Sequence, residues 1–236
     1  ANLSYGPQGL ELLAGGGSAA DAVAQLTDSD EEREHRQIGV VDAQGRGATF
    51  TGSACMDWAG GKAGDGFAIQ GNILAGTQVV EAMADAWATP PGGSFERRLI
   101  AALSAGDQVG GDRRGRQSAA LRVWREGAAY GGVLDIAIDL RVDDHQTPID
   151  ELGRLLDLHE LYFGEPDPDS LLPLEGALAE EVAADLETLG YETSGGLAAA
   201  LDAWASTENF EERMVPGELD PVLLAQLRQQ AADKRS

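Results

Sequence analysis

Apolar positions over the first 28 residues repeat at helical spacing, and a run of glycines interrupts them once. Between residues 5 and 28 the apolar side chains lie three to four positions apart, and the stretch AGGGS divides the pattern, which predicts two short helices. Ser18 and Asp21 form a capping-box pattern for the second helix, because the Ser18 hydroxyl can accept an orphan amide N–H and the Asp21 carboxylate can accept the Ser18 N–H in return. The apolar positions are Leu10, Leu13, Val23 and Leu26.

The pattern then changes to short alternating segments that are typical of antiparallel strands. HRQIGVVDAQGRGATFTGSAC predicts a hairpin with strands at 38–41 and 48–51 around a turn at 44–47, and GFAIQGNIL predicts a further short strand. QSAALRVWRE and LDIAIDLRVDD predict a second antiparallel pair across the turn GAAYGG. Helices are predicted at 77–88 and 95–105, separated by TPPGG, and at 148–163, where Pro148 suits the first turn.

This order of helices, strands, helices, strands and helix indicates an α+β layered sandwich over residues 1–164. The stretch GEPDPDSLLP is rich in proline and acid, and we interpret residues 165–173 as a linker. Residues 174–236 are almost wholly helical in pattern, with an apolar stripe at helical spacing. They predict a compact bundle of about 60 residues. The stripe consists of Leu178, Val182, Leu186 and Leu189.

Charge narrows the function classes. The chain has 17 Lys and Arg against 40 Asp and Glu, a formal net charge of -23, and the acids are interleaved with apolar residues along the whole sequence. No broad basic surface is predicted, which disfavours nucleic acid and anionic membranes as partners. Only Lys62 and Lys234 are lysines. A net charge this negative makes the chain repel itself, and dissolved salt screens that repulsion. We therefore hypothesise a halophilic source and a cytoplasmic location. The alternative is a mesophile of high GC content that prefers Arg to Lys.

The scarce positive charge gathers in one glycine-rich turn, GGDRRGRQSAAL, over residues 110–121. Guanidinium groups of Arg113 and Arg114 could bind a substrate carboxylate bidentately. Alternatively, the arginines pair with Asp112 or Asp107 and fix the turn before the strand. Gln117 and Ser118 open that strand, where they would meet substrate or cap the sheet edge. Cys55 is the only cysteine, which excludes an intrachain disulfide.

Three long segments resemble a known family. GSACMDWAGGKAGDGFAIQGNILAG, GGDRRGRQSAALRV and DLRVDDHQTPIDELGRLLDLHELYFG closely resemble the bacterial and archaeal family called domain of unknown function 1028. The tail segments LETLGY, WASTENFEERM and ELDPVLLAQLR are similar to a peptidoglycan-binding-like helical domain often fused to that family. The family is grouped with the N-terminal-nucleophile hydrolases, so the resemblance implies a four-layer αββα sandwich and the hydrolysis of amide bonds.

In that class the first residue of the mature chain, Thr, Ser or Cys, supplies the nucleophile, and its own α-amine acts as base. The resemblance implies an additional strand carrying this residue before the match to residues 3–10. Ala1 has no nucleophilic side chain. We therefore expect the first strands of the sandwich, and the nucleophile with them, to lie upstream of the printed sequence; loss of activity is the alternative.

Several of the remaining candidate residues have both a functional and a structural interpretation. Asn72, at a strand end, could donate its amide to an oxyanion, or could serve ordinary turn geometry. Asp57 and Trp58 are candidates for lining the site, as is Asp112 beside the arginines. Cys55 is interpreted as packing rather than as an internal nucleophile. The cluster DDH at 143–145 suggests metal ligands, but adjacent strand residues point to opposite faces, so no metal or cofactor is expected. Trp204, Phe210 and Tyr191 are interpreted as core of the tail, with a glycan platform as the alternative.

Together these observations predict a hydrolase of the N-terminal-nucleophile class that acts on a small amide or peptide-like substrate bearing an anionic group. The alternative is a non-catalytic protein that binds cell-wall or other ligands. A homo-oligomer whose arginine turn makes a subunit contact is a third interpretation.

Overall fold

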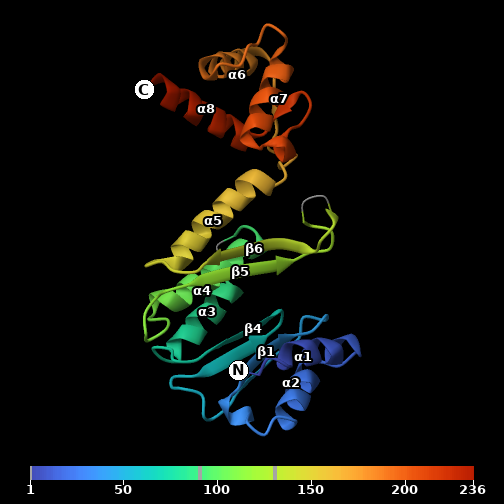
Figure 1. Ribbon diagram of the computed structural model, residues 1–236, viewed down its shortest axis with the longest axis vertical. Coiled ribbons are helices and arrows are strands. Elements are labelled where there is room, and N and C mark those ends of the chain that lie inside the picture. The colour runs from blue at the N-terminus through green and yellow to red at the C-terminus, as the bar shows by residue number, and fades with distance from the viewer. Residues whose placement is uncertain (1, 90–91, 130–131) are drawn as a thin grey trace. The chain divides into compact units, whose positions relative to one another are not determined.

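The computed structural model describes residues 2–89, 92–129 and 132–236, which divide into two compact units (Figure 1). The first is Ala1–Gly153 and the second is Arg154–Ser236. The division falls inside helix α5 (Pro148–Phe163). This division does not test the domain boundaries predicted at residues 164 and 174, which stay predictions. Two predicted turns, TPPGG and GAAYGG, include residues 90–91 and 130–131, which lie outside the described residues.

The first unit begins with the two predicted short helices, α1 (Tyr5–Ala14) and α2 (Ala19–Asp28). The capping box is confirmed: the Asp21 N–H donates to Ser18 Oγ at 3.1 Å, and the Ser18 N–H donates to the Asp21 carboxylate at 3.2 Å. Helix α2 buries its apolar face, including Val23 and Leu26, and packs on the hairpin that follows.

That hairpin is formed by β1 (Gln37–Val41) and β2 (Gly47–Thr51), close to the predicted bounds. A second antiparallel hairpin follows, β3 (Gly60–Gly64) with β4 (Phe67–Gly71). Strand β3 was not predicted from the sequence, because GGKAG has no apolar alternation and glycine is depleted in strands.

Glycine is needed there because the two hairpins pack against each other very closely. A Cβ added at Gly61 would lie 2.7 Å from Thr49 Oγ1, and one at Gly47 would lie 2.1 Å from the Phe67 carbonyl oxygen. A side chain at Gly47 would meet main-chain atoms of the second hairpin and force the hairpins apart, and one at Gly61 would displace the Thr49 side chain. Gly61 of β3 is therefore explained by tertiary packing and not by a local strand preference.

Two helices and a third hairpin complete the first unit. Helices α3 (Gln78–Ala88) and α4 (Phe95–Gln108) lie side by side, and α3 packs on β3 and β4. Ile69 of β4 forms a buried cluster with Val80 and Ala84. Strands β5 (Ala119–Trp124) and β6 (Ile136–Val142) pair antiparallel as predicted.

The second unit contains the end of α5, then α6 (Gly176–Leu189), α7 (Leu197–Glu208) and α8 (Pro221–Arg235), with a short pair β7 (Leu172–Pro173) and β8 (Glu218–Leu219). Helix α6 ends at Gly190, whose φ of 99° is the left-handed conformation of a helix C-cap. The predicted stripe contributes Val182 and Leu186 to a core in which both are fully buried.

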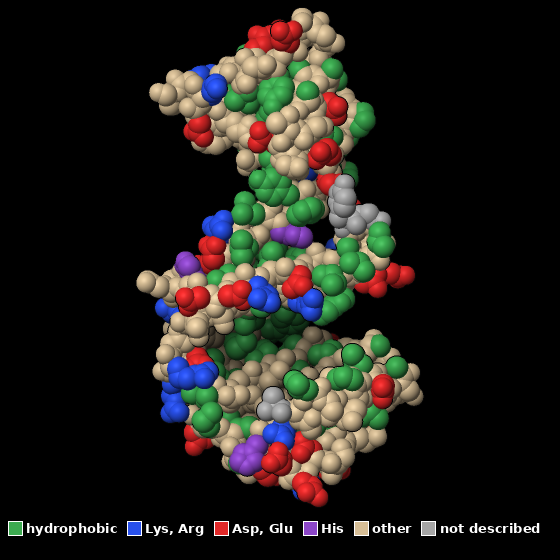
Figure 2. All heavy atoms as spheres, viewed as in Figure 1, with side chains coloured by type: hydrophobic (Ala, Val, Ile, Leu, Met, Phe, Trp, Pro, Cys, Tyr) green, Lys and Arg blue, Asp and Glu red, His purple; other side chains and the backbone are tan. Residues whose placement is uncertain are grey.

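Mixed helices and antiparallel strands are compatible with the predicted α+β class. The strands in the described residues pair only as two-stranded sheets. On the face shown in Figure 2, acidic side chains are scattered over both units with arginines between them, and no broad basic patch is visible. Among the helices of the described residues, none combines the length and hydropathy needed to cross a membrane.

A pH-dependent contact links α2 to the first hairpin. The buried Asp42 carboxylate accepts hydrogen bonds from the Ala19 N–H at 3.1 Å and from the Arg46 N–H and Nε at 3.0 and 2.7 Å. Burial raises the pKa of Asp42, but these hydrogen bonds outweigh it and lower the pKa to about 2. An unfolded Asp has a pKa of about 3.9.

Since the folded pKa lies below the unfolded pKa, Asp42 stabilises the first unit above about pH 4, and this contribution is lost as pH falls through about 2. We expect Asp42→Asn to lower the melting temperature at pH 7, with the difference from wild type shrinking towards pH 2. Calorimetry at a series of pH values measures it, and Asp85→Asn, at an exposed position on α3, is the control. A difference that does not depend on pH would contradict this assignment.

Candidate functional site

Two of the sequence segments, residues 52–76 and 110–123, meet at Ile73 in the first unit. The Ile73 N–H donates to the Met56 carbonyl at 3.1 Å, its carbonyl accepts from the Arg113 N–H at 2.9 Å, and Leu74 forms a β-bridge with Asp112. Ile73 has a φ of 57°, a conformation that is an outlier for a β-branched residue. Backbone held in this region costs about 1–3 kcal/mol and clusters at functional sites. The segments that carry Asp57, Asn72 and Arg113 are therefore joined at one strained residue.

Asn72 presents an oriented amide next to this junction. Its Nδ2 donates to Gln37 Oε1 at 3.3 Å. The Gln37 amide is fixed in turn, because its Nε2 lies 3.0 Å from Thr51 Oγ1, 3.2 Å from the Gly60 carbonyl oxygen and 2.9 Å from that of Gly71. One N–H of Asn72 is thus held by Gln37. The other has no acceptor among the described residues, and Asn72 is exposed.

Asn72 lies at a groove of about 690 Å³ between α1 and β1. Its lining combines apolar side chains, among them Leu10, Leu13 and Ile38, with the polar side chains of Asn72 and Arg36. Its volume is within the range of small-molecule sites. Cys55 lines the same groove, and its Sγ donates to the Arg36 carbonyl at 3.3 Å. A groove lined by both apolar and polar side chains suits a ligand that carries groups of both kinds.

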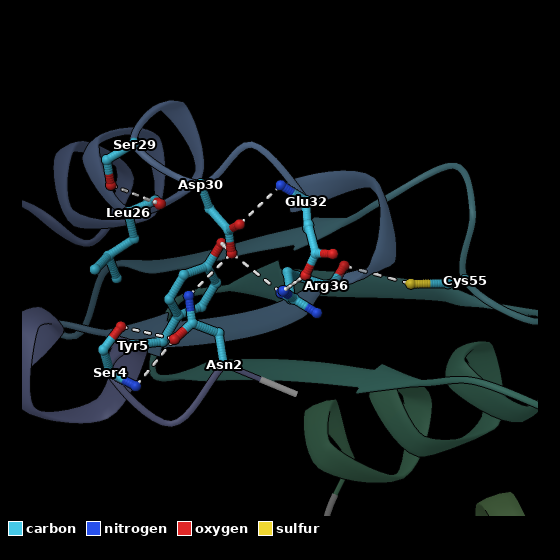
Figure 3. A network of polar contacts seen from close by, with 9 residues as sticks. All are labelled: Asn2, Ser4, Tyr5, Leu26, Ser29, Asp30, Glu32, Arg36 and Cys55. Atoms are coloured by element: carbon cyan, nitrogen blue, oxygen red, sulfur yellow. Dashed lines mark hydrogen bonds and ion pairs between the residues drawn. The ribbon is translucent and has the colours of Figure 1, made fainter.

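A polar network holds the α1 wall of this groove in place (Figure 3). Asp30 accepts from Asn2 Nδ2 at 3.0 Å, Tyr5 Oη at 3.0 Å and Arg36 Nε at 3.1 Å. The hydrogen bond from Asn2, with those from Glu32 and Arg36, outweighs burial and holds the pKa of Asp30 well below its usual range. Burial and the neighbouring Asp30 raise the pKa of Tyr5. The network ties α1 to the segment before β1, so we assign it a structural role.

The arginine turn is largely neutralised by its own acids. Arg114 forms a bidentate pair with Asp112, with Nε at 2.9 Å and Nη2 at 2.6 Å, and Arg116 pairs with Asp107 at 2.7 Å. Arg114 and Arg113 lower the pKa of Asp112, against the effect of burial. These contacts agree with the structural alternative for Arg114 and Arg116. Arg113 is exposed and makes no ion pair with any residue that the structure describes.

The predicted substrate residues divide between two hollows of the first unit. Asp112, Arg114, Gln117 and Ser118 line a second hollow of about 690 Å³, whose floor includes Val79, Met83 and Leu103. Asn72 lines the groove, while Asp57 and Arg113 line neither hollow. Trp58 packs on the buried cluster around Ile69 and Val80.

Other candidates have ordinary structural contacts. In the DDH cluster, Asp143 pairs with Arg141, and His145 Nδ1 accepts from the Thr147 N–H at 3.1 Å. Within residues 2–89, 92–129 and 132–236 no group of His, Cys, Asp and Glu has the arrangement of a metal site. Trp204 and Phe210 are 0% and 2% exposed, so they cannot form a glycan platform.

Sequence reasoning missed Gln37, which orients Asn72 from 35 positions away. The only local signal is a polar residue that opens an apolar strand, and this is too common to be informative. The groove itself was also missed, because it depends on how α1 lies against β1.

The chain thus combines two parts: an α+β unit that carries the candidate site, and a helical unit that follows it. Residues 1–152 match the family described as "Family of unknown function (DUF1028)", and residues 162–227 match "Putative peptidoglycan binding domain". The chain belongs to the DUF1028 family, as the sequence resemblance predicted.

A solved relative supports this assignment. Protein SPO2555 from Silicibacter pomeroyi, a DUF1028 protein, is 29% identical in sequence, with a TM-score of 0.59. The similarity covers 76% of this chain and 71% of that chain. No curated protein matches the chain. The N-terminal-nucleophile class stays a prediction.

Proposed function

We propose that the first unit hydrolyses an amide bond in a small, peptide-like substrate that carries an anionic group. The observation that supports this most directly is the Asn72 amide, which Gln37 holds in one orientation at a groove. A donor that is oriented before substrate binds can stabilise the oxyanion of an amide's tetrahedral intermediate without reorganising. Asn72 is therefore assigned the oxyanion contact.

Arg113 is assigned the substrate's anionic group. It is the cation of the turn that has no ion pair among the described residues. Its backbone N–H donates a hydrogen bond to the carbonyl of Ile73, the neighbour of Asn72. Asp112 holds Arg114 in place, and Gln117 and Ser118 line the second hollow, where we assign them further substrate contacts. Asp57 lines neither hollow but follows Met56, whose carbonyl accepts from the Ile73 N–H, and we assign it a substrate contact from that side.

The proposal includes the N-terminal-nucleophile mechanism, the four-layer sandwich as the complete fold of this domain, and a C-terminal helical bundle. The nucleophile is then a Thr, Ser or Cys at the start of the mature chain, with its α-amine as base. No residue between 1 and 236 is assigned that role. N-terminal sequencing and intact mass of the protein purified from its native host test it; a mature chain starting at Ala1 would contradict the mechanism.

Activity is tested by screening N-acyl amino acids for released amine, beside the corresponding acyl amides without a carboxylate. We expect turnover of the anionic substrates at a kcat/KM well above that of the neutral ones. Turnover of neither set, by protein with a confirmed nucleophilic N-terminus, would contradict the proposed hydrolysis.

We expect Arg113→Ala to raise KM for an anionic substrate by roughly 10- to 100-fold with kcat little changed, since a hydrogen bond to a charged group contributes about 1.5–3 kcal/mol. Arg113→Lys should restore only part of the loss, because Lys lacks the planar fork of donors. The control is Arg122→Ala, which removes an exposed arginine paired with Asp139 on the β5–β6 hairpin. An unchanged KM for Arg113→Ala would show that this arginine does not bind substrate.

A second candidate function is cell-wall binding by the second unit, which the family match over residues 162–227 favours. Because Trp204 and Phe210 are buried in the core, such binding would use other, exposed residues. Sedimentation of the full protein with insoluble peptidoglycan tests it. Protein that stays in the supernatant would contradict this function.

A further inference from the structure

The turn between β3 and β4 carries Asp65–Gly66, which is the only Asp–Gly sequence of the chain, and the chain has no Asn–Gly sequence. It is a two-residue turn, because Gly64 pairs with Phe67. Both Asp65 and Gly66 are exposed. In an Asp–Gly sequence the main-chain nitrogen of the glycine can attack the carboxyl carbon of the aspartate, since glycine has no side chain to block the approach. A reactive sequence thus lies at an exposed turn.

The surroundings of this turn leave the attack unhindered. Gly66 has a φ of 77°, which glycine adopts without steric cost, and a Cβ added there would meet nothing within 4 Å. The Asp65 carboxylate makes no hydrogen bond or ion pair with any residue that the structure describes. Nothing in the described part of the chain therefore holds this carboxylate away from the Gly66 nitrogen.

The Gly66 nitrogen is restrained by one contact. Its N–H donates to the Gly45 carbonyl at 2.6 Å, and Arg46 forms a β-bridge with Asp65, so the turn packs on the turn of the β1–β2 hairpin. The reaction removes this N–H, and the contact must open first. Exposed turns open locally without unfolding of the whole unit. Because Asp42 holds Arg46 through its N–H at 3.0 Å, we expect Asp42 to control how often the contact opens.

We propose that Asp65 is a site of spontaneous covalent modification, where the residue closes to a cyclic imide and reopens as isoaspartate, and that this change separates the two turns. A bond forms between the Gly66 nitrogen and Asp65 Cγ, and the amide hydrogen leaves with the carboxyl hydroxyl as water. Water then opens the imide at the former main-chain carbonyl of Asp65, so the chain continues through Cγ and an α-carboxylate is left. The reaction needs no oxidant or catalyst, and it is independent of the proposed hydrolysis.

The products do not fit the contact between the turns. In the imide the Gly66 nitrogen carries no hydrogen, so it cannot donate to the Gly45 carbonyl. In isoaspartate the main chain of the two-residue turn is one methylene longer, which opposes the pairing of Gly64 with Phe67. The turn that carries Arg46 then loses its neighbour. We therefore expect isoaspartate at residue 65 to lower the melting temperature of the first unit.

Incubation of the full-length protein at pH 7, below its melting temperature, tests the proposal. Mass spectrometry of the peptide that contains residue 65 detects the imide by its loss of one water, and electron-transfer fragmentation distinguishes isoaspartate from aspartate of the same mass. We expect isoaspartate at residue 65 to form at least tenfold faster than at Asp169, which is exposed in a turn but precedes Ser170. The incubated protein should gain a lower melting transition in proportion to its isoaspartate content.

Two sets of variants are the controls. Asp65→Glu keeps the charge but would have to close a larger ring, so it should give neither isomer nor lower transition. Asp65→Asn should react at least tenfold faster, because ammonia leaves an amide more readily than water leaves a carboxylate. Asp42→Asn, which weakens the turn that carries Arg46, should speed the reaction at residue 65 at least threefold. Asp85→Asn, at an exposed position on α3, should leave the rate unchanged.

Several outcomes would overturn the proposal. Isoaspartate that forms in concentrated urea but not in the folded protein would show that the contact with Gly45 protects the turn completely. A rate at residue 65 no higher than at Asp169 also rejects the site. Isoaspartate without a lower melting transition, or the same transition in incubated Asp65→Glu, rejects the separation of the turns. An unchanged rate in Asp42→Asn rejects control by Asp42.

Discussion

Replacing Asn72 by Ala is expected to lower kcat for amide hydrolysis by about 100- to 1000-fold, with KM little changed. Removing one donor from an oxyanion site has this magnitude, because the contact strengthens only as charge develops on the carbonyl oxygen. The Asn72 amide is fixed by Gln37 and not by substrate, so its loss should appear in the chemical step. Steady-state kinetics on the best amide from the substrate screen measures it.

The control for this prediction is Gln108→Ala, which removes an exposed amide on α4 whose Nε2 donates to Ser104 Oγ at 3.1 Å. It should keep wild-type kcat and KM. Asn72→Asp should be as impaired as Asn72→Ala, because a carboxylate would repel the oxyanion that the amide stabilises. An effect of Asn72→Ala on KM alone would indicate a binding contact, and no effect on kcat would remove Asn72 from the mechanism.

Replacing Arg213 by Met is expected to destabilise the second unit by about 3–5 kcal/mol, the usual cost of removing one partner of a buried ion pair. Arg213 Nη1 lies 2.6 Å from Asp220 Oδ2, and the two side chains are 8% and 2% exposed. Its Nε also donates to the Leu161 carbonyl at 2.7 Å, which ties the end of α5 to the core of this unit. Removing Arg213 leaves a buried carboxylate without its counter-charge.

Urea unfolding of the full protein, followed by hydrogen exchange of peptides from α8, measures this loss in the second unit. The control is Arg228→Met, which breaks an exposed pair with Glu181 and should cost less than about 1 kcal/mol. The double variant Arg213→Met with Asp220→Asn should recover part of the loss, although Asp220 also caps α8 through the Val222 N–H at 2.8 Å. An Arg213 variant as mild as the Arg228 variant would contradict the assignment.

The helices could be predicted because each carries a local signal. The apolar repeat, the Ser18 cap and the stop at Gly190 all act within a few residues. Strand β3 could not be predicted, since Gly61 is explained by close contact with Thr49 of the β1–β2 hairpin, and Gly60 and Gly64 by close contacts with the Trp58 and Phe67 rings. Local propensity does not contain that information.

The candidate site was predictable to a similar degree. The pairing of Arg114 with Asp112 and of Arg116 with Asp107 involves residues close in sequence, and both acids were named as alternatives. The orientation of Asn72 was not predictable, because it depends on Gln37 and through Gln37 on Thr51, Gly60 and Gly71. The separation of the named residues into two hollows is likewise a result of tertiary packing.

The left-handed backbone at Ile73 makes stability and turnover compete at one position. Glycine would adopt a φ of 57° without the steric cost that an isoleucine bears, and would therefore be favoured in a selection for heat resistance. The same change would loosen the connection between the segments that carry Asn72 and Arg113. Variants of this protein selected for heat tolerance and variants selected for catalysis should therefore diverge at residue 73, even though its side chain is not assigned a contact with substrate.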